Sequence, residues 1–226
     1  MKPGVCLSQN QIDAAGRLHQ QLRQWEHADR CLATIANQFP GIDEDSCFIK
    51  TTVLDRLYGT NLPDLARTAE HIHGALVQQG DAKADIELVE KMGFLPESRN
   101  EPARRQGSFA SKFAHFFIDS EQFPIMDRYS QRIVAYHLEK PQTRAEQNRS
   151  YRVFYAEWKE LREQCGIACG CREFDRYLWI AGQYHAHLKL GKKAKLNKEV
   201  RELFRLAEDQ PDLKLLVPEA DRIGRR

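Results

Sequence analysis

The sequence predicts an all-α protein. Apolar residues recur at helical spacing along most of the chain, whereas the period-two alternation of β-branched residues that marks strands is almost absent. Prolines and glycines stand mainly between the periodic stretches. With 226 residues, 42% of them hydrophobic and 29% charged, the chain can bury a sizeable core and has a globular composition. We therefore expect residues 1–226 to form a single multi-helix unit.

The first half of the chain predicts helices separated by turn signals. The first is a helical hairpin with apolar positions from Leu18 to Phe39, which ends at Pro40-Gly41. A helix capped by Asp45 or Ser46 then runs to Leu57, and a helix capped by Asn61 continues from Pro63 to Leu76. A short helix from Ala84 to Met92 follows. Gly93–Gly107 then follows as a polar connection with two prolines, and we expect no regular structure in it.

The second half predicts five further helices. They are expected at Phe109–Ile118, Arg128–Leu138, Tyr151–Glu163, Glu173–His187 and, after the cap Asn197, up to Leu206. The remaining tail, 207–226, is punctuated by proline, and we expect it to be loosely attached.

Composition narrows the classes of partner and compartment. The 34 Lys and Arg residues against 32 Asp and Glu residues give a net charge of +2, which is too small to indicate nucleic acid without a local basic stretch. No apolar run is long enough to span a membrane, and the first residues lack an apolar signal segment. These features predict a cytoplasmic protein with no membrane partner, and we expect a monomer.

The cysteines do not indicate a cofactor. Six cysteines at irregular spacing favour reduced thiols over a disulfide framework. The one cluster, Cys165-x3-Cys169-x-Cys171, matches none of the usual iron–sulfur spacings, and spacing does not support His185 or His187 as an extra metal ligand. We therefore expect neither a metal nor a cofactor.

Lys112 is the first residue with chemical interest. It shares a helical face with Phe109, Phe113 and Phe116, and it is expected in the first turn, where the helix dipole disfavours an ammonium by about 0.3–1 kcal/mol. Desolvation and the dipole both favour the neutral amine, which is the nucleophilic form. The alternative is that the aliphatic stem covers the phenylalanines and the ammonium extends to water.

Asp127 is the second residue with chemical interest. It follows Pro124-Ile125-Met126 and precedes the periodic set that begins at Tyr129, which places it at the N-cap of the next helix. A simple cap explains it fully. The helix from Lys112 extends only about 10 Å further and the connection after it reaches at most about 26 Å, so the chain can double back. Amine and carboxylate can therefore share one cleft.

These residues resemble the helix-hairpin-helix DNA glycosylases. Lys112-Phe113-Ala114 and Pro124-Ile125-Met126-Asp127-Arg128 are similar to the lysine helix and the aspartate segment of that family, and the resemblance covers roughly 48–138. Leu57-Tyr58-Gly59-Thr60-Asn61-Leu62 is similar to the asparagine turn of 8-oxoguanine glycosylases. Before the lysine, Arg104-Arg105-Gln106-Gly107 carries one glycine where the family hairpin has two, which looks more like the divergent archaeal branch.

The resemblance implies a two-lobed helical architecture and a reaction on DNA. Lys112 would attack the anomeric carbon of a modified nucleotide, Asp127 would stabilise the sugar cation, and β-elimination of the strand can follow. Asn61, Arg104, Arg105 and Gly107 would contact the DNA. A second basic stretch, Lys189 to Arg201, offers further charge for phosphates, although both stretches are equally well read as solvated loops.

Two other functions remain open. A non-catalytic nucleic-acid-binding or interaction protein with this helical fold would explain the loss of the second hairpin glycine. An enzyme that forms an imine with a small carbonyl metabolite would also use Lys112, but it would be indifferent to DNA.

Overall fold

The structure is a computed structural model that describes residues 7–80, 82–98, 102–141, 150–206 and 210–217. The all-α prediction is confirmed: eleven α-helices and one 3-10 turn occur in these residues, beside a single pair of two-residue strands. The chain divides into two compact units, which we describe separately. Unit 1 comprises Met1–Glu26, Asp127–Asn148 and Ala156–Arg226, and unit 2 comprises His27–Met126 and Arg149–Tyr155.

Three helices of unit 2 begin at an aspartate N-cap. They are α3 (Glu44–Tyr58), α4 (Leu65–Gln79) and α5 (Ile86–Gly93), capped by Asp43, Asp64 and Asp85. Each carboxylate accepts a hydrogen bond from the backbone N–H three residues later, which satisfies a donor that the helix leaves free. The predicted caps of α3 are wrong, because Ser46 donates both its N–H and its hydroxyl to Asp43.

Asn61, the predicted cap of the next helix, lies before it. Its φ of 54° is left-handed instead of the extended conformation of a cap, and its side-chain amide donates to the Gly59 carbonyl at 2.8 Å. Asp55 shapes this turn by accepting from the Leu62 N–H and the Thr60 hydroxyl. The turn therefore ends α3 and delays α4 to Leu65.

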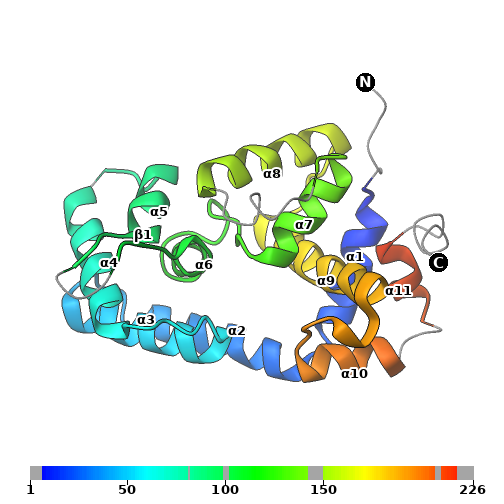
Figure 1. The fold of residues 1–226 in the computed structure, drawn as a ribbon, viewed down its shortest axis with the longest axis horizontal. Coiled ribbons are helices and arrows are strands. Elements are labelled where there is room, and N and C mark those ends of the chain that lie inside the picture. The colour runs from blue at the N-terminus through cyan, green and yellow to red at the C-terminus, as the bar shows by residue number, and fades with distance from the viewer. Residues whose placement is uncertain (1–6, 81, 99–101, 142–149, 207–209, 218–226) are drawn as a thin grey trace. The chain divides into compact units, whose positions relative to one another are not determined.

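The connection between α5 and α6 (Gly107–Phe117) has regular structure that the sequence did not predict. Strand β1 (Phe94–Leu95) pairs antiparallel with β2 (Arg104–Arg105). The Gly93 carbonyl accepts from the Gln106 N–H at 2.7 Å, which closes the hairpin at the ends of both helices. The prediction of an unstructured connection is wrong at these four residues, because strand pairing depends on backbone partners that no local pattern records. In Figure 1, β1 lies next to α5 and α6.

The core of unit 1 forms where α7 (Arg128–His137) packs on α9 (Cys171–Leu190). Ile133 and Val134 of α7 are fully buried, as are Leu178 and Ala181 of α9. Gly182 marks the closest approach, since a Cβ there would lie only 2.4 Å from the carbonyl oxygen of Tyr129. A glycine is therefore required at this helix crossing.

A buried polar pair joins the same two helices. The phenol of Tyr177 lies 2.6 Å from His137 Nε2. Burial raises the pKa of Tyr177 well above its usual value, so the phenol keeps its proton in this hydrogen bond.

The remaining helices of unit 1 include one that contradicts a prediction. Helix α1 (Gln9–His19) packs on α9 and on α11 (Pro211–Leu216), which lies within the expected loose tail. Leu213, Leu216 and Val217 are completely buried, and the Arg17 guanidinium contacts the Asp212 carboxylate at 2.6 Å. The tail is therefore docked at 210–217, because its apolar residues find partners on α1; residues 207–209 and 218–226 lie outside the described part.

Other helices agree with the predictions. The stretch from Leu18 to Phe39 divides at Gln20–Leu22 into α1 and α2 (Arg23–Gln38). Helix α8 is Tyr151–Cys165, and α10 (Lys198–Leu206) begins after the predicted cap Asn197, which accepts from the Glu199 N–H at 2.9 Å. Within the described residues, none of the helices combines the length and the apolar composition needed to cross a membrane.

Candidate functional site

Helix α6 places Lys112 in its second turn. The helix begins at Gly107, two residues before the expected start, because the Gln106 carbonyl already accepts from the Ala110 N–H at 2.9 Å. The dipole effect expected for a first-turn lysine is therefore weaker here, since it declines within the first turn.

The side chain of Lys112 is buried among apolar neighbours. Lys112 is 5% exposed, and Phe109 and Phe113 beside it are 2% and 1% exposed. The Nζ atom donates to Ser108 Oγ at 2.7 Å and to the Ser108 carbonyl at 3.2 Å, one helical turn back. The interpretation in which the ammonium extends to water is wrong, because hydrogen bonds to the helix itself replace water. A buried lysine amine is a candidate nucleophile.

Ser111 connects the lysine helix to the segment that leads to Asp127. Its hydroxyl is fully buried, accepts from the Met126 N–H at 3.0 Å and donates to the Ser108 carbonyl at 3.1 Å. Met126 is the residue before Asp127, and consecutive Cα atoms are 3.8 Å apart. Ser111, which precedes Lys112, is therefore hydrogen-bonded to Met126, which precedes Asp127.

Asp127 is the N-cap of α7, as predicted. Its Oδ1 accepts from the N–H groups of Tyr129 and Ser130, both at 2.8 Å, and its own N–H donates to Ser130 Oγ. Both accepted bonds end on Oδ1, which leaves Oδ2 without a hydrogen-bond donor among the described residues. A half-buried carboxylate fixed through one oxygen can offer the other to a cation. Lys112 belongs to unit 2 and Asp127 to unit 1, so their common cleft stays a prediction.

The predicted DNA-contacting residues of the hairpin lie directly before Lys112. Arg105 is exposed and its guanidinium lies 5.8 Å from the ring centre of Phe94 on the paired strand, while Arg104 is half-buried. A Cβ on Gly107 would meet Met126 Cε at 2.6 Å, so a larger residue there would require the end of the Met126 side chain to shift. Gly93 precedes the first strand of the hairpin. A Cβ at this position would lie only 3.2 Å from the Gly107 Cα, so the backbone at the two ends of the hairpin packs closely. Asn61 is exposed on its turn.

A second buried lysine in unit 2 was missed. Lys50 on α3 is 3% exposed, donates to the Gly41 carbonyl at 2.7 Å and lies 5.7 Å from the ring centre of Phe117. Burial disfavours the charged form of each group, so it lowers the pKa of Lys50 and raises the pKa of Cys47, one turn away, to about 11. The sequence signal was its spacing, since Cys47, Lys50 and Leu54 share one helical face.

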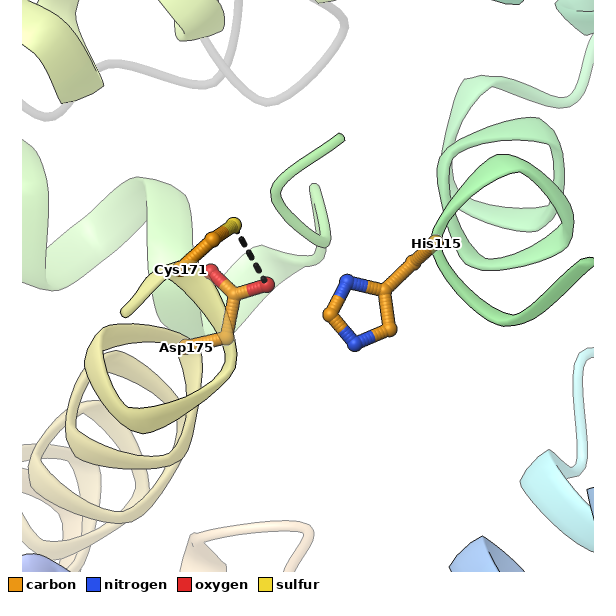
Figure 2. A group of neighbouring side chains, drawn as sticks. All are labelled: His115, Cys171 and Asp175. Carbon is orange, nitrogen blue, oxygen red and sulfur yellow. Dashed lines mark hydrogen bonds between the residues drawn. The ribbon is translucent and has the colours of Figure 1, made fainter. Parts of the chain in front are cut away.

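The cysteines of the described residues are free thiols, and Cys6 lies outside that part. Figure 2 shows Cys171 and Asp175 one turn apart on α9, with the 4.0 Å bond from Cys171 Sγ to Asp175 Oδ2 dashed. Burial raises the pKa of Cys169, so its thiol keeps its proton. His115, also drawn in Figure 2, belongs to α6 of unit 2, where its Nδ1 donates to the Phe123 carbonyl at 2.9 Å. A thiol that keeps its proton, as that of Cys169 does, is typical of a structural cysteine.

One comparison with known families gives a match. Residues 11–122 are similar to the family HI_0787_N, whose model is described as an N-terminal domain. The match covers slightly less than half of the chain, includes Lys112 and the arginine hairpin, and ends before Asp127. No curated protein and no solved structure matches the chain. The description names no activity, so a functional assignment must come from the residues themselves.

Proposed function

We propose that the protein is a DNA glycosylase in which Lys112 is the nucleophile and Asp127 stabilises the sugar cation. The observation that carries the proposal is the Ser111 hydroxyl, which hydrogen-bonds the chain at Met126 to the helix of a buried lysine. Lys112 directly follows Ser111, and Asp127 directly follows Met126. A lysine and an aspartate are the pair that imine-forming base excision requires. The partner would be DNA that contains a modified base.

The surroundings of Lys112 favour a nucleic-acid substrate over a small metabolite. The exposed Arg105 and its neighbour Arg104 stand immediately before α6, whose N-cap residue Gln106 makes no side-chain capping bond. A basic hairpin followed by an uncapped helix N-terminus is suited to phosphate groups. The resemblance to helix-hairpin-helix glycosylases is consistent with α5, the β1–β2 hairpin and α6 in this order.

The reaction follows from these residues. The modified base leaves the duplex stack, and its glycosidic bond breaks while a bond from Lys112 Nζ to the anomeric carbon forms. The Asp127 carboxylate stabilises the positive charge that develops on the sugar. Opening of the sugar ring then gives an imine between the lysine and the sugar, from which β-elimination can cleave the strand.

Borohydride trapping tests the proposal. The full-length protein is incubated with duplexes that carry different modified bases, the imine is reduced, and the cross-linked peptide is mapped. We expect the adduct on Lys112 and none on the other buried lysine, Lys50. Lys112→Gln should abolish trapping and nicking while binding persists, and Asp127→Asn should slow base release while it retains a capping oxygen.

Lys83→Gln serves as the matched control, because Lys83 is an exposed lysine of the same unit and should be dispensable. Full excision by folded Lys112→Gln would eliminate Lys112 as the nucleophile. DNA binding without trapping on any modified base would favour the non-catalytic binding protein, and trapping of a free aldehyde with indifference to DNA would favour the metabolite enzyme.

A further inference from the structure

A basic loop of unit 1 presents two lysines that have no ionic partner among the described residues. Lys193 and Lys195, between α9 and α10, are exposed, and neither forms an ion pair with a described residue. The acidic groups nearby in sequence are engaged elsewhere. Glu199 accepts from the Gln24 N–H at 3.1 Å, and the Glu202 carboxylate lies 4.0 Å from Lys198. The positive charge of the two lysines is therefore not neutralised by the loop itself.

The backbone of this loop is fixed from inside. Ala194 and Leu196 are 3% and 9% exposed, so burial alternates with the outward lysines. The Lys195 carbonyl accepts from the Tyr129 hydroxyl at 2.6 Å and from Arg128 Nη2 at 2.8 Å. Because two apolar anchors and two hydrogen bonds already hold the backbone of this loop, the backbone loses little conformational freedom when the lysines bind a ligand.

The two anchoring donors locate the loop beside the proposed catalytic aspartate. Arg128 and Tyr129 are the first two residues of α7 and follow Asp127 directly. The Arg128 guanidinium also covers the Tyr129 ring, 4.6 Å from its centre, and Arg128 is exposed. Three cationic side chains of unit 1, Arg128, Lys193 and Lys195, therefore lie on the end of α7 that carries Asp127 and on the loop bonded to it.

We propose that Lys193 and Lys195 form a second phosphate-binding site for the DNA backbone. This inference rests on the proposed function, because it takes DNA as the substrate. The site would hold the strand next to the nucleotide at Asp127, while the Arg104–Arg105 hairpin contacts DNA from unit 2. Exposed lysines contact phosphates as point charges and release counterions, so they contribute affinity without base specificity.

The test is the salt dependence of DNA binding. The Kd for an unmodified duplex is measured from 50 to 200 mM salt with the full-length Lys112→Gln protein, in which no chemistry interferes. Loss of two phosphate contacts through Lys193→Ala and Lys195→Ala should reduce the slope of log K against log salt by about 1.8. The ratio of the two Kd values across this range should then shrink about 12-fold.

Two further double variants make the result specific. Lys193→Arg with Lys195→Arg keeps the charges and should retain the slope. Lys83→Ala with Lys159→Ala removes the same amount of charge from two exposed lysines elsewhere and should leave the slope unchanged. An unchanged slope in the loop variant, an equal effect in the control, or no DNA binding at 50 mM salt would overturn the inference. The trapping experiment is separate, so failure of this site leaves the glycosylase proposal intact.

Discussion

Replacement of Gly182 by alanine tests the packing of the helix that Asp127 caps. The added Cβ would lie 2.4 Å from the carbonyl oxygen of Tyr129 and 2.8 Å from its carbonyl carbon. Both atoms belong to the backbone of α7, so no side chain can rotate away. Helices α7 and α9 must separate by up to about 1 Å, and such a gap already forfeits a quarter to a half of the contact energy between the atoms involved.

The expected magnitude is the balance of two effects. Alanine is a better helix former than glycine by about 1 kcal/mol, whereas overpacking of a core costs about 1–3 kcal/mol. Gly16→Ala isolates the first effect, since Gly16 lies inside α1 of the same unit and a Cβ there meets nothing within 4 Å. We expect Gly16→Ala to stabilise the protein by about 0.5–1 kcal/mol and Gly182→Ala to destabilise it relative to that control by about 1–3 kcal/mol.

Thermal unfolding followed by circular dichroism measures the difference. A change of 1 kcal/mol corresponds to about 2–4 °C in the melting temperature for a chain of this size, so the two variants should differ by about 2–12 °C. Equal melting temperatures for Gly182→Ala and Gly16→Ala would refute the close helix crossing. If Asp127 acts in base excision, Gly182→Ala should also slow excision at a temperature where the variant is folded.

Three further predictions address stability. Ser111→Ala should lose about 1–3 kcal/mol in urea unfolding, because the buried Met126 N–H loses its acceptor; an unchanged value would contradict this. Leu213→Ala in α11 should lose about 2–5 kcal/mol and the exposed Leu215→Ala much less, and equal losses would mean that α11 is not docked. Between pH 9.0 and 11 the unfolded Cys47 thiol releases its proton before the folded one, so the free energy of unfolding of the wild type relative to Cys47→Ala should fall as pH rises; a constant difference would contradict the burial of this thiol.

The sequence determined the features that depend on near neighbours. The helical class, the cap at Asp127 and the cap at Asn197 were predicted, because a cap is a hydrogen bond between residues two or three positions apart. The place of Lys112 on an apolar face was predicted for the same reason, since helical periodicity fixes which residues share a face. Errors occurred where several local candidates competed, as at Asp43 and Asp64, because only the backbone geometry decides which carboxylate reaches the free N–H groups.

Tertiary structure decided everything that depends on distant partners. The docking of α11 requires α1, almost two hundred residues earlier, as the Arg17–Asp212 pair with a separation of 195 residues illustrates. The β1–β2 pairing, the bond from Ser111 to Met126 and the anchoring of Lys195 by Arg128 and Tyr129 all join residues that no periodic pattern relates. A hydrogen bond or a helix crossing of this kind exists only when the folded chain brings its two partners together, so a single sequence specifies the residues but not the contact.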